Sequence, residues 1–159
     1  MMGFVFLIGC SRMCETSRED FTPEEVVEAY LNISLNMSSL DEKEALLLLT
    51  TGNLKTALQQ ASDETLMSAF IKKNLLLESY AVIERRDRTP RETEVTFEIA
   101  FRNLGPKKNK VDPKKTPLVT TENTVSVRKE EGIWLIHDVL GKKTNIDFPI
   151  SAEETITPK

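Results

Sequence analysis

The sequence predicts an α+β domain in which N-terminal helices pack on one face of a curved antiparallel sheet. Between residues 21 and 73, apolar residues recur at helical spacing behind sequences typical of helix starts. After Asn74 apolar and polar residues alternate instead, and polar turns separate the alternating runs, which favours strands joined as hairpins. A chain of 159 residues with 40% apolar residues can bury a core without disulfides or metal.

The first expected helix begins at a capping box. Thr22 takes the N-cap position, Pro23 the first helical position and Glu25 the third, while Phe21 is placed to pack on Val26. After this start, apolar residues recur every three or four positions, so one face of the helix should pack against the core. The inward residues expected are Val26, Tyr30, Ile33 and Met37.

Shorter helical segments should follow. Ser39 and Glu42 repeat the capping pattern, and the run 46–49 after them is expected to be buried because it is apolar on nearly every side. Residues 50–53 interrupt this helix, and Ser62 caps a last short segment. The inward residues of the last two segments are expected to be Leu54, Ala57, Leu58, Ala61, Leu66, Met67, Phe70 and Ile71.

Four strands are expected in the second half of the chain. The run 92–103 is the most regular, since alternate positions carry Val95, Phe97, Ile99 and Phe101. A polar turn precedes it, a longer loop follows from Gly105 to Pro117, and a Glu-Glu-Gly turn joins the last two strands. Residues 141–159 are polar and are expected to form a tail. The expected strands cover residues 75–86, 92–103, 119–129 and 133–139.

The amino terminus indicates a location. Residues 1–9 are apolar but far shorter than the roughly 20 residues that a membrane-spanning helix needs. Residues 7–10, Leu-Ile-Gly-Cys, resemble a bacterial lipobox, whose cysteine is lipidated. We therefore expect residues 1–9 to be a truncated signal segment, Cys10 to be the lipidation site and residues 10–20 to form a tether. The missing basic residues are explained by a true start further upstream.

A buried strand over residues 4–8 with an ordinary buried Cys10 is the alternative. Cys14 does not fit a lipobox because Arg12 and Met13 precede it, so it is interpreted as a thiol in the tether. A lipobox followed by Ser11 rather than an acidic residue implies a lipid anchor in the bacterial cell envelope, on the periplasmic face of the outer membrane in a Gram-negative cell.

Charge and composition exclude some functions. A net charge of -4 argues against nucleic-acid binding by phosphate neutralisation, and two cysteines with one histidine give almost nothing for a zinc site. No cofactor is expected. One basic loop interrupts the acidic chain and is either a solvated hairpin tip or a contact with an anionic membrane surface or acidic partner. Its lysines are Lys107, Lys108, Lys110, Lys114 and Lys115.

The segments 22–31 (TPEEVVEAYL) and 131–136 (EGIWLI) resemble the NTF2-like superfamily, in which helices pack into the concavity of a cone-shaped sheet. Within it, the chain is most similar to small bacterial lipoproteins of the DUF4878 type. The resemblance covers residues 21–140, expected to be the folded domain. It implies a pocket at the wide end of the cone and, in enzymes such as ketosteroid isomerase and SnoaL-like cyclases, an acid-base residue inside it.

We therefore expect a non-catalytic envelope lipoprotein that binds a protein partner or a small apolar ligand and that could form a homodimer. The alternative is a SnoaL-like or ketosteroid-isomerase-like enzyme. His137 is a weak candidate for its acid-base residue, and neighbouring Asp138 points to the opposite face of the strand, so the two form no dyad. Aromatic residues line the cavity or fill the core: Tyr30, Phe70, Tyr80, Phe97, Phe101 and Trp134.

Overall fold

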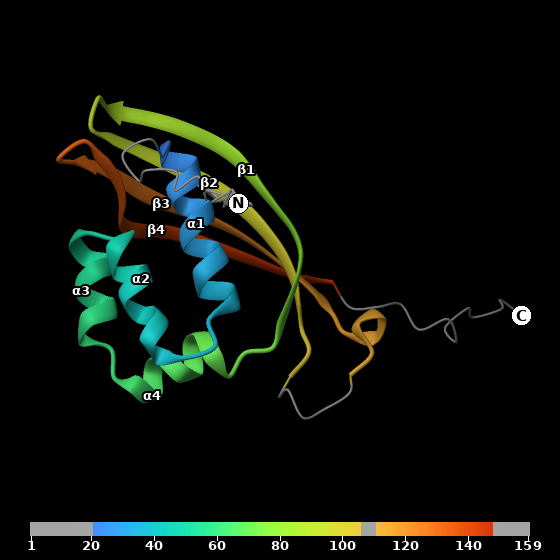
Figure 1. The fold of residues 1–159 in the computed structure, drawn as a ribbon. Coiled ribbons are helices and arrows are strands. Elements are labelled where there is room, and N and C mark those ends of the chain that lie inside the picture. The colour runs from blue at the N-terminus through green and yellow to red at the C-terminus, as the bar shows by residue number, and fades with distance from the viewer. Residues whose placement is uncertain (1–20, 106–110, 148–159) are drawn as a thin grey trace, which may run out of the picture.

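The computed structural model describes residues 21–105 and 111–147. The described chain runs through the helical elements first and the strands afterwards. Figure 1 shows the helices α1 to α4 on one side of a curved sheet, with α1 lying along its concave face. The order of elements and their layers are those expected from the sequence.

The sheet has four antiparallel strands in the order β1-β2-β3-β4. A tight turn at Pro90 and Arg91 joins the first two strands, and Glu131 and Gly132 form the last turn. The prediction is confirmed for the second strand, whose bounds are those expected, and for the third to within one residue at each end. The strands are β1 (Leu75–Thr89), β2 (Glu92–Asn103), β3 (Leu118–Glu130) and β4 (Ile133–Asp147).

The last strand is longer than expected. We expected it to end at Val139, but β4 continues to Asp147, so residues 141–147 belong to the sheet and not to a tail. Their backbone pairs with the first half of β3, from Gly141 opposite Thr124 to Asp147 opposite Leu118. Apart from Gly141 and the exposed Ile146, these residues are polar on both faces, so the alternation that identifies a half-buried strand is missing there.

The helices begin where the capping sequences indicated. Thr22 Oγ1 accepts a hydrogen bond from Glu25 N (3.2 Å), and Glu25 Oε2 accepts one from Thr22 N (2.7 Å). Glu42 Oε1 accepts from the Ser39 backbone (3.2 Å), and Ser62 caps the last segment. The helical elements are α1 (Pro23–Asn36), the 3-10 turn η2 (Leu40–Glu42), α2 (Lys43–Leu48), α3 (Gly52–Gln60), α4 (Asp63–Leu66) and the π turn η3 (Met67–Ile71).

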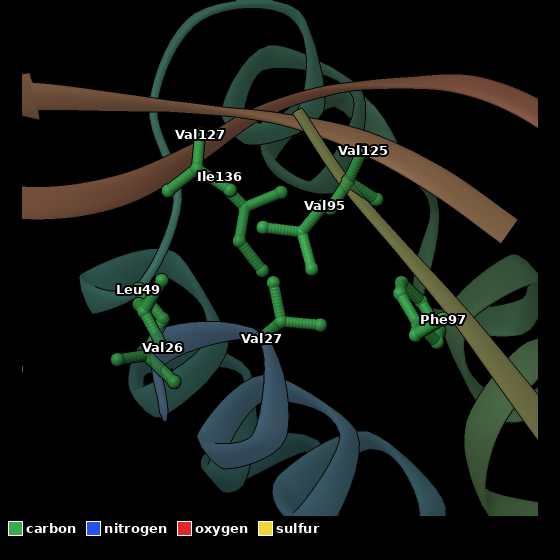
Figure 2. Close-up of a cluster of buried hydrophobic side chains, with 8 residues drawn as sticks. All are labelled: Val26, Val27, Leu49, Val95, Phe97, Val125, Val127 and Ile136. Carbon is green, nitrogen blue, oxygen red and sulfur yellow. The ribbon is translucent and has the colours of Figure 1, made fainter. Parts of the chain in front are cut away.

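Two hydrophobic clusters hold the helices to the sheet and to one another. Figure 2 shows the first, in which side chains of α1 meet those of β2, β3 and β4: Val26, Val27, Leu49, Val95, Phe97, Val125, Val127 and Ile136. The second lies among the helices and contains Met37, Leu46, Leu47, Leu58 and Leu66.

Three residues expected inside are exposed: Leu48, Ala57 and Met67. Ala57 lies on the outer side of α3, whose buried residue is Leu58. Leu48, in the run expected to be buried, is 52% exposed, and Met67 is 37% exposed. Leu48 ends a helix of six residues that packs its other two leucines inward. One face of so short a helix contacts the core, so Leu48 on the opposite face stays exposed. Met67 lies where α4 passes into the wider π turn η3, which rotates the following side chains away from the α-helical register.

The segment between α2 and α3 fixes the helices to the edge of the sheet. Thr50 forms a parallel bridge with Ile136, in which Thr51 N donates to the Ile136 carbonyl (2.8 Å) and Ile136 N donates to the Leu49 carbonyl (3.0 Å). The buried Thr50 hydroxyl donates back to the Leu46 carbonyl (3.1 Å). The first half of β4 is therefore covered at its outer edge.

Candidate ligand pocket

An apolar pocket of about 150 Å³ lies between α1, α3 and the concave face of the sheet. Helix α1 supplies Val27, Tyr30 and Leu31, which share one face at spacings of three and four, and α3 supplies Leu54. The strands contribute residues of their inward-facing rows. These are Phe97 and Ile99 of β2, Asn123 and Val125 of β3, and Ile136 and Val139 of β4.

A second pocket of about 160 Å³ adjoins the first and is more polar. The two share Ile99 and Asn123 as lining residues. We call the second the polar pocket, because it adds charged and hydroxyl groups to an apolar floor. It is lined by Ser34, Leu35, Ala69, Phe70, Lys73, Leu75, Ile99, Phe101, Thr121, Asn123 and Lys142.

Hydrogen bonds hold the polar side chains of this pocket. Asn123 Nδ2 donates to Thr121 Oγ1 (3.1 Å). Thr121 is buried, with only 1% of its surface exposed. Ser34 Oγ donates to the Leu31 carbonyl (3.1 Å) within α1. The Ser34 proton is therefore engaged, whereas the Thr121 hydroxyl accepts from Asn123 and keeps its own proton to donate.

The aromatic residues expected to share one cavity are distributed over several hollows. Tyr30 and Phe97 line the apolar pocket, and Phe70 and Phe101 line the polar pocket. Phe97 is also part of the buried core, so this residue both lines the cavity and fills the core.

The other two aromatic residues lie elsewhere. Tyr80 lines a hollow of about 100 Å³ beside α1, and its ring centroid is 5.9 Å from that of Phe97. Trp134 lines an open surface depression with Arg85 and Arg88, and Lys129 Nζ lies 5.6 Å from its ring centroid. Neither residue is among those that line the two adjoining pockets.

Burial changes the acidity of both tyrosines. It raises the pKa of Tyr30 to about 12. The pKa of Tyr80 also rises to about 12, through burial first and then through the negative charges of Glu28 and Glu24. The Tyr80 Oη atom is buried and has no hydrogen-bond partner within the part of the chain that the structure describes.

His137 is not among the lining residues of either pocket. Its Nε2 atom accepts a hydrogen bond from Arg128 Nη1 (2.9 Å), and Arg128 Nη2 reaches Glu92 Oε1 at 3.4 Å. Asp138 Oδ2 instead accepts from Asn53 Nδ2 (2.8 Å), and this hydrogen bond lowers the pKa of the Asp138 carboxyl. His137 thus takes part in a polar network that links β2, β3 and β4.

The N-terminal anchor and part of the basic loop lie outside the described residues, among them Cys10, Lys107, Lys108 and Lys110. Lys114 and Lys115 end the short 3-10 turn η4 (Pro113–Lys115), where both are exposed. Contact of this loop with an anionic surface stays a prediction.

The polar residues of the second pocket were not among the site residues expected from the sequence. In the strand expected over 119–129, Thr121 and Asn123 stand at the same alternate positions as Val125 and Val127, so they face the same side of the sheet. Polar residues in an inward-facing row were the available signal. Lys142 gave no such signal, because its segment was expected to be a tail.

The described residues lack two kinds of site. Within 21–105 and 111–147, no helix is long and apolar enough to cross a membrane. The same residues contain no group of three or more histidine, cysteine, aspartate or glutamate side chains arranged to hold a metal ion.

Comparison with known proteins identifies a shared fold. The intermembrane space region of the chloroplast protein ARC6 matches with a TM-score of 0.51 and 14% sequence identity, over 79% of this chain and 93% of that one. The chain shares the fold of that region. The predicted fold class is thus confirmed: helices packed on a curved antiparallel sheet.

The other comparisons add no family. The VirB8 protein of Agrobacterium tumefaciens matches with a TM-score of 0.39 and 16% identity, over 82% of this chain and 97% of that one. No family model and no curated protein matches the sequence.

Proposed function

We propose that this chain is a non-catalytic lipoprotein of the bacterial cell envelope, similar to the DUF4878-type group, whose NTF2-like domain binds a small apolar ligand. The observation that carries the binding function is the apolar pocket. Its lining side chains include no aspartate, glutamate, histidine, cysteine or lysine, and its volume is about 150 Å³.

A pocket of this size and lining suits an apolar guest. An engineered protein cavity of about 150 Å³ lined by leucine, isoleucine and phenylalanine stays free of water and binds benzene. A water molecule would find few hydrogen-bond partners in this pocket, because Asn123 carries the only amide side chain among its lining residues. An apolar molecule, in contrast, removes its own surface from water when it binds there. The contribution is about 25 cal/mol for each Å² of apolar surface buried.

The same lining weakens the enzymatic alternative. Acid-base catalysis needs a titratable group within hydrogen-bond reach of the substrate. His137, the candidate from the sequence, contacts Arg128 and lies outside both pockets, and the only ionisable side chain that lines the apolar pocket is Tyr30. A phenol with a pKa of about 12 is a poor base at neutral pH.

A protein partner remains a second candidate because β1 is a long edge strand. It pairs only with β2 in the described sheet and exposes four apolar side chains along its length. Edge strands of this kind offer unpaired backbone groups to another chain. The exposed apolar residues are Leu76, Leu77, Val82 and Ile83.

The envelope location rests on Cys10 and its lipobox-like surroundings. The ARC6 region of the same fold lies in an intermembrane space, which is compatible with such a location. Mass spectrometry of the native amino terminus tests the anchor: a diacylglyceryl-modified Cys10 is expected, and an unmodified cysteine would remove it. Cys10→Ser should move the protein from the membrane fraction to the soluble fraction.

Ligand binding is tested with benzene and the full chain. Titration followed by methyl NMR should shift signals of the lining residues Val27, Leu54 and Val125. Val139→Phe should fill the pocket and abolish these shifts. Leu140→Phe is the matched control, because Leu140 is as exposed as Val139 but is not among the lining residues. Equal shifts in both variants would contradict the proposed site.

A further inference from the structure

We propose that the apolar pocket and the polar pocket together bind a small amphipathic carboxylate, with its apolar chain in the first and its carboxylate between Lys73 and Lys142 in the second. This inference rests on the proposed function and narrows the class of its ligand. Four observations support it: the shared lining of the two pockets, two lysines whose side chains have no partner among the described residues, a neutral donor beside them, and a lining without acidic residues.

The two pockets adjoin. Ile99 and Asn123 line both, so a ligand that extends past these side chains occupies the two pockets together. Helix α1 covers the junction, since Leu31 lines the apolar pocket and Leu35, one turn later, lines the polar pocket. The combined site has an apolar end and a polar end, and the ligand it fits has the same two ends.

The polar end carries two positive charges without partners. Lys73 follows η3 and Lys142 lies in β4, and neither side chain makes a hydrogen bond or ion pair within the described residues. The neighbouring Lys143 differs, because its Nζ pairs with Glu122 Oε1 at 3.0 Å. No aspartate or glutamate lines the polar pocket, so the two lysines keep their positive field for a ligand, although the chain carries a net charge of -4.

Neutral groups in the pocket also favour a ligand that accepts hydrogen bonds. The Thr121 hydroxyl has its proton to donate, whereas Asn123 Nδ2 donates to both the hydroxyl (3.1 Å) and the carbonyl (3.4 Å) of Thr121. Both residues stand in the inward row of β3 and line the polar pocket. A carboxylate has two oxygens and accepts several hydrogen bonds, so it satisfies the lysine and hydroxyl donors together.

An uncharged apolar ligand would leave these donors unused. A cation would meet two lysines and no carboxylate. A single carboxylate is preferred to a larger polyanion, because the pocket offers two exposed lysines and no arginine, whose planar fork suits phosphate groups. The site is thus expected to prefer a medium-chain carboxylate to the alcohol of the same length.

The test compares octanoate with 1-octanol on the full chain by isothermal titration calorimetry. Octanoate should bind about threefold to tenfold more tightly, as expected of two exposed charge pairs, and added salt should reduce this advantage. Both compounds should compete with benzene for the apolar pocket.

Charge variants separate the two ends of the site. Lys73→Gln combined with Lys142→Gln should remove the advantage of octanoate and leave 1-octanol binding unchanged. Lys143→Gln is the matched control, since this lysine is adjacent to Lys142 but pairs with Glu122, and it should preserve the advantage. Val139→Phe should weaken both compounds.

The outcomes distinguish this inference from the function on which it rests. Equal affinities for octanoate and 1-octanol, or an advantage that survives the double substitution, would overturn the carboxylate site while leaving the apolar pocket intact. Absence of binding by benzene and both octyl compounds would overturn the proposed function itself. Circular dichroism of each variant establishes that a loss of affinity does not come from unfolding.

Discussion

The imidazole ring of His137 occupies the space that a Cβ atom on Gly52 would need. A side chain built at Gly52 would overlap the Cδ2 and Nε2 atoms of His137, and Gly52 itself has a φ of +53°. The first residue of α3 is therefore a glycine for two reasons, a left-handed backbone and a close contact. The histidine that seemed a candidate for catalysis helps instead to dock α3 against β4.

Gly52→Ala should destabilise the protein. The left-handed conformation alone costs a residue with a side chain about 1 to 2 kcal/mol, and the overlap with His137 adds to this. Urea unfolding followed by the fluorescence of Trp134 measures the loss.

Gly105→Ala is the matched control for that change. Gly105 has a φ of +69°, but no atom of the described residues lies within 4 Å of the Cβ position. It should therefore lose only the conformational part. Adding His137→Ala to Gly52→Ala should relieve the overlap, and equal losses in Gly52→Ala and Gly105→Ala would show that the contact with His137 costs nothing.

The capping box of α1 should make stability depend on pH. The hydrogen bonds from the backbone and then the side chain of Thr22 lower the pKa of Glu25 below its ordinary value of 4.5. Ionised Glu25 therefore contributes stability that is present above about pH 4.5 and is lost as the pH falls through the lowered folded-state value. Urea unfolding of the wild type and Glu25→Gln should show a difference that shrinks as the solution is acidified.

Glu28→Gln serves as the control for Glu25→Gln. Glu28 is exposed on the same helix, and its carboxylate makes no hydrogen bond among the described residues. Its substitution removes one carboxylate from α1 without touching the capping box, so it measures the effect of losing a charge on this helix. If Glu25→Gln behaves in the same way, the capping box does not stabilise ionised Glu25.

Both tyrosines should ionise at a higher pH than tyrosines in the unfolded chain. The chain has two tyrosines, and burial raises the pKa of each to about 12. The folded protein should thus show little phenolate absorbance near pH 10, where tyrosines in the unfolded chain are about half ionised. Because the raised values favour the protonated folded form, stability should fall as the pH rises from about 10 to 12.

Tyr80→Phe separates the hydroxyl from the ring. The Tyr80 Oη atom is buried without a partner in the described part of the chain, so its removal should be neutral or stabilising. Tyr80→Ala removes the ring that packs on Phe97 and should destabilise. A marked loss in Tyr80→Phe would show that the hydroxyl is satisfied in solution.

The order of elements could be predicted from the sequence because local signals agree with tertiary packing in most of the chain. Thr22 and Glu25 define a helix start through contacts three residues apart, and Val95 and Phe97 define a strand by alternation. The second half of β4 lacked such a signal. Its strand conformation comes from backbone pairing with β3, for example between Lys142 and Asn123. The sequence of the segment itself contains no pattern that would indicate this pairing.

The site was harder to predict than the fold. Tyr30 and Phe97 were expected at a cavity and do line one, but six aromatic residues do not meet in a single hollow. Which inward residues line space and which fill it depends on the distance between α1 and the sheet. Strand alternation places Thr121 on the inward face but does not bring it near Lys73, which is distant in the sequence.

The two leucines of α2 with opposite exposure should respond very differently to truncation. Leu46 is fully buried in the cluster that joins the helices, whereas Leu48 is 52% exposed. Leu46→Ala should lower the free energy of unfolding by about 2 to 5 kcal/mol, because it removes apolar contacts and leaves a cavity. Leu48→Ala should change it much less, since solvent already reaches half of that side chain and alanine is the better helix former. Urea unfolding of both variants measures the difference, and similar losses at the two positions would mean that α2 presents another face to the core in solution.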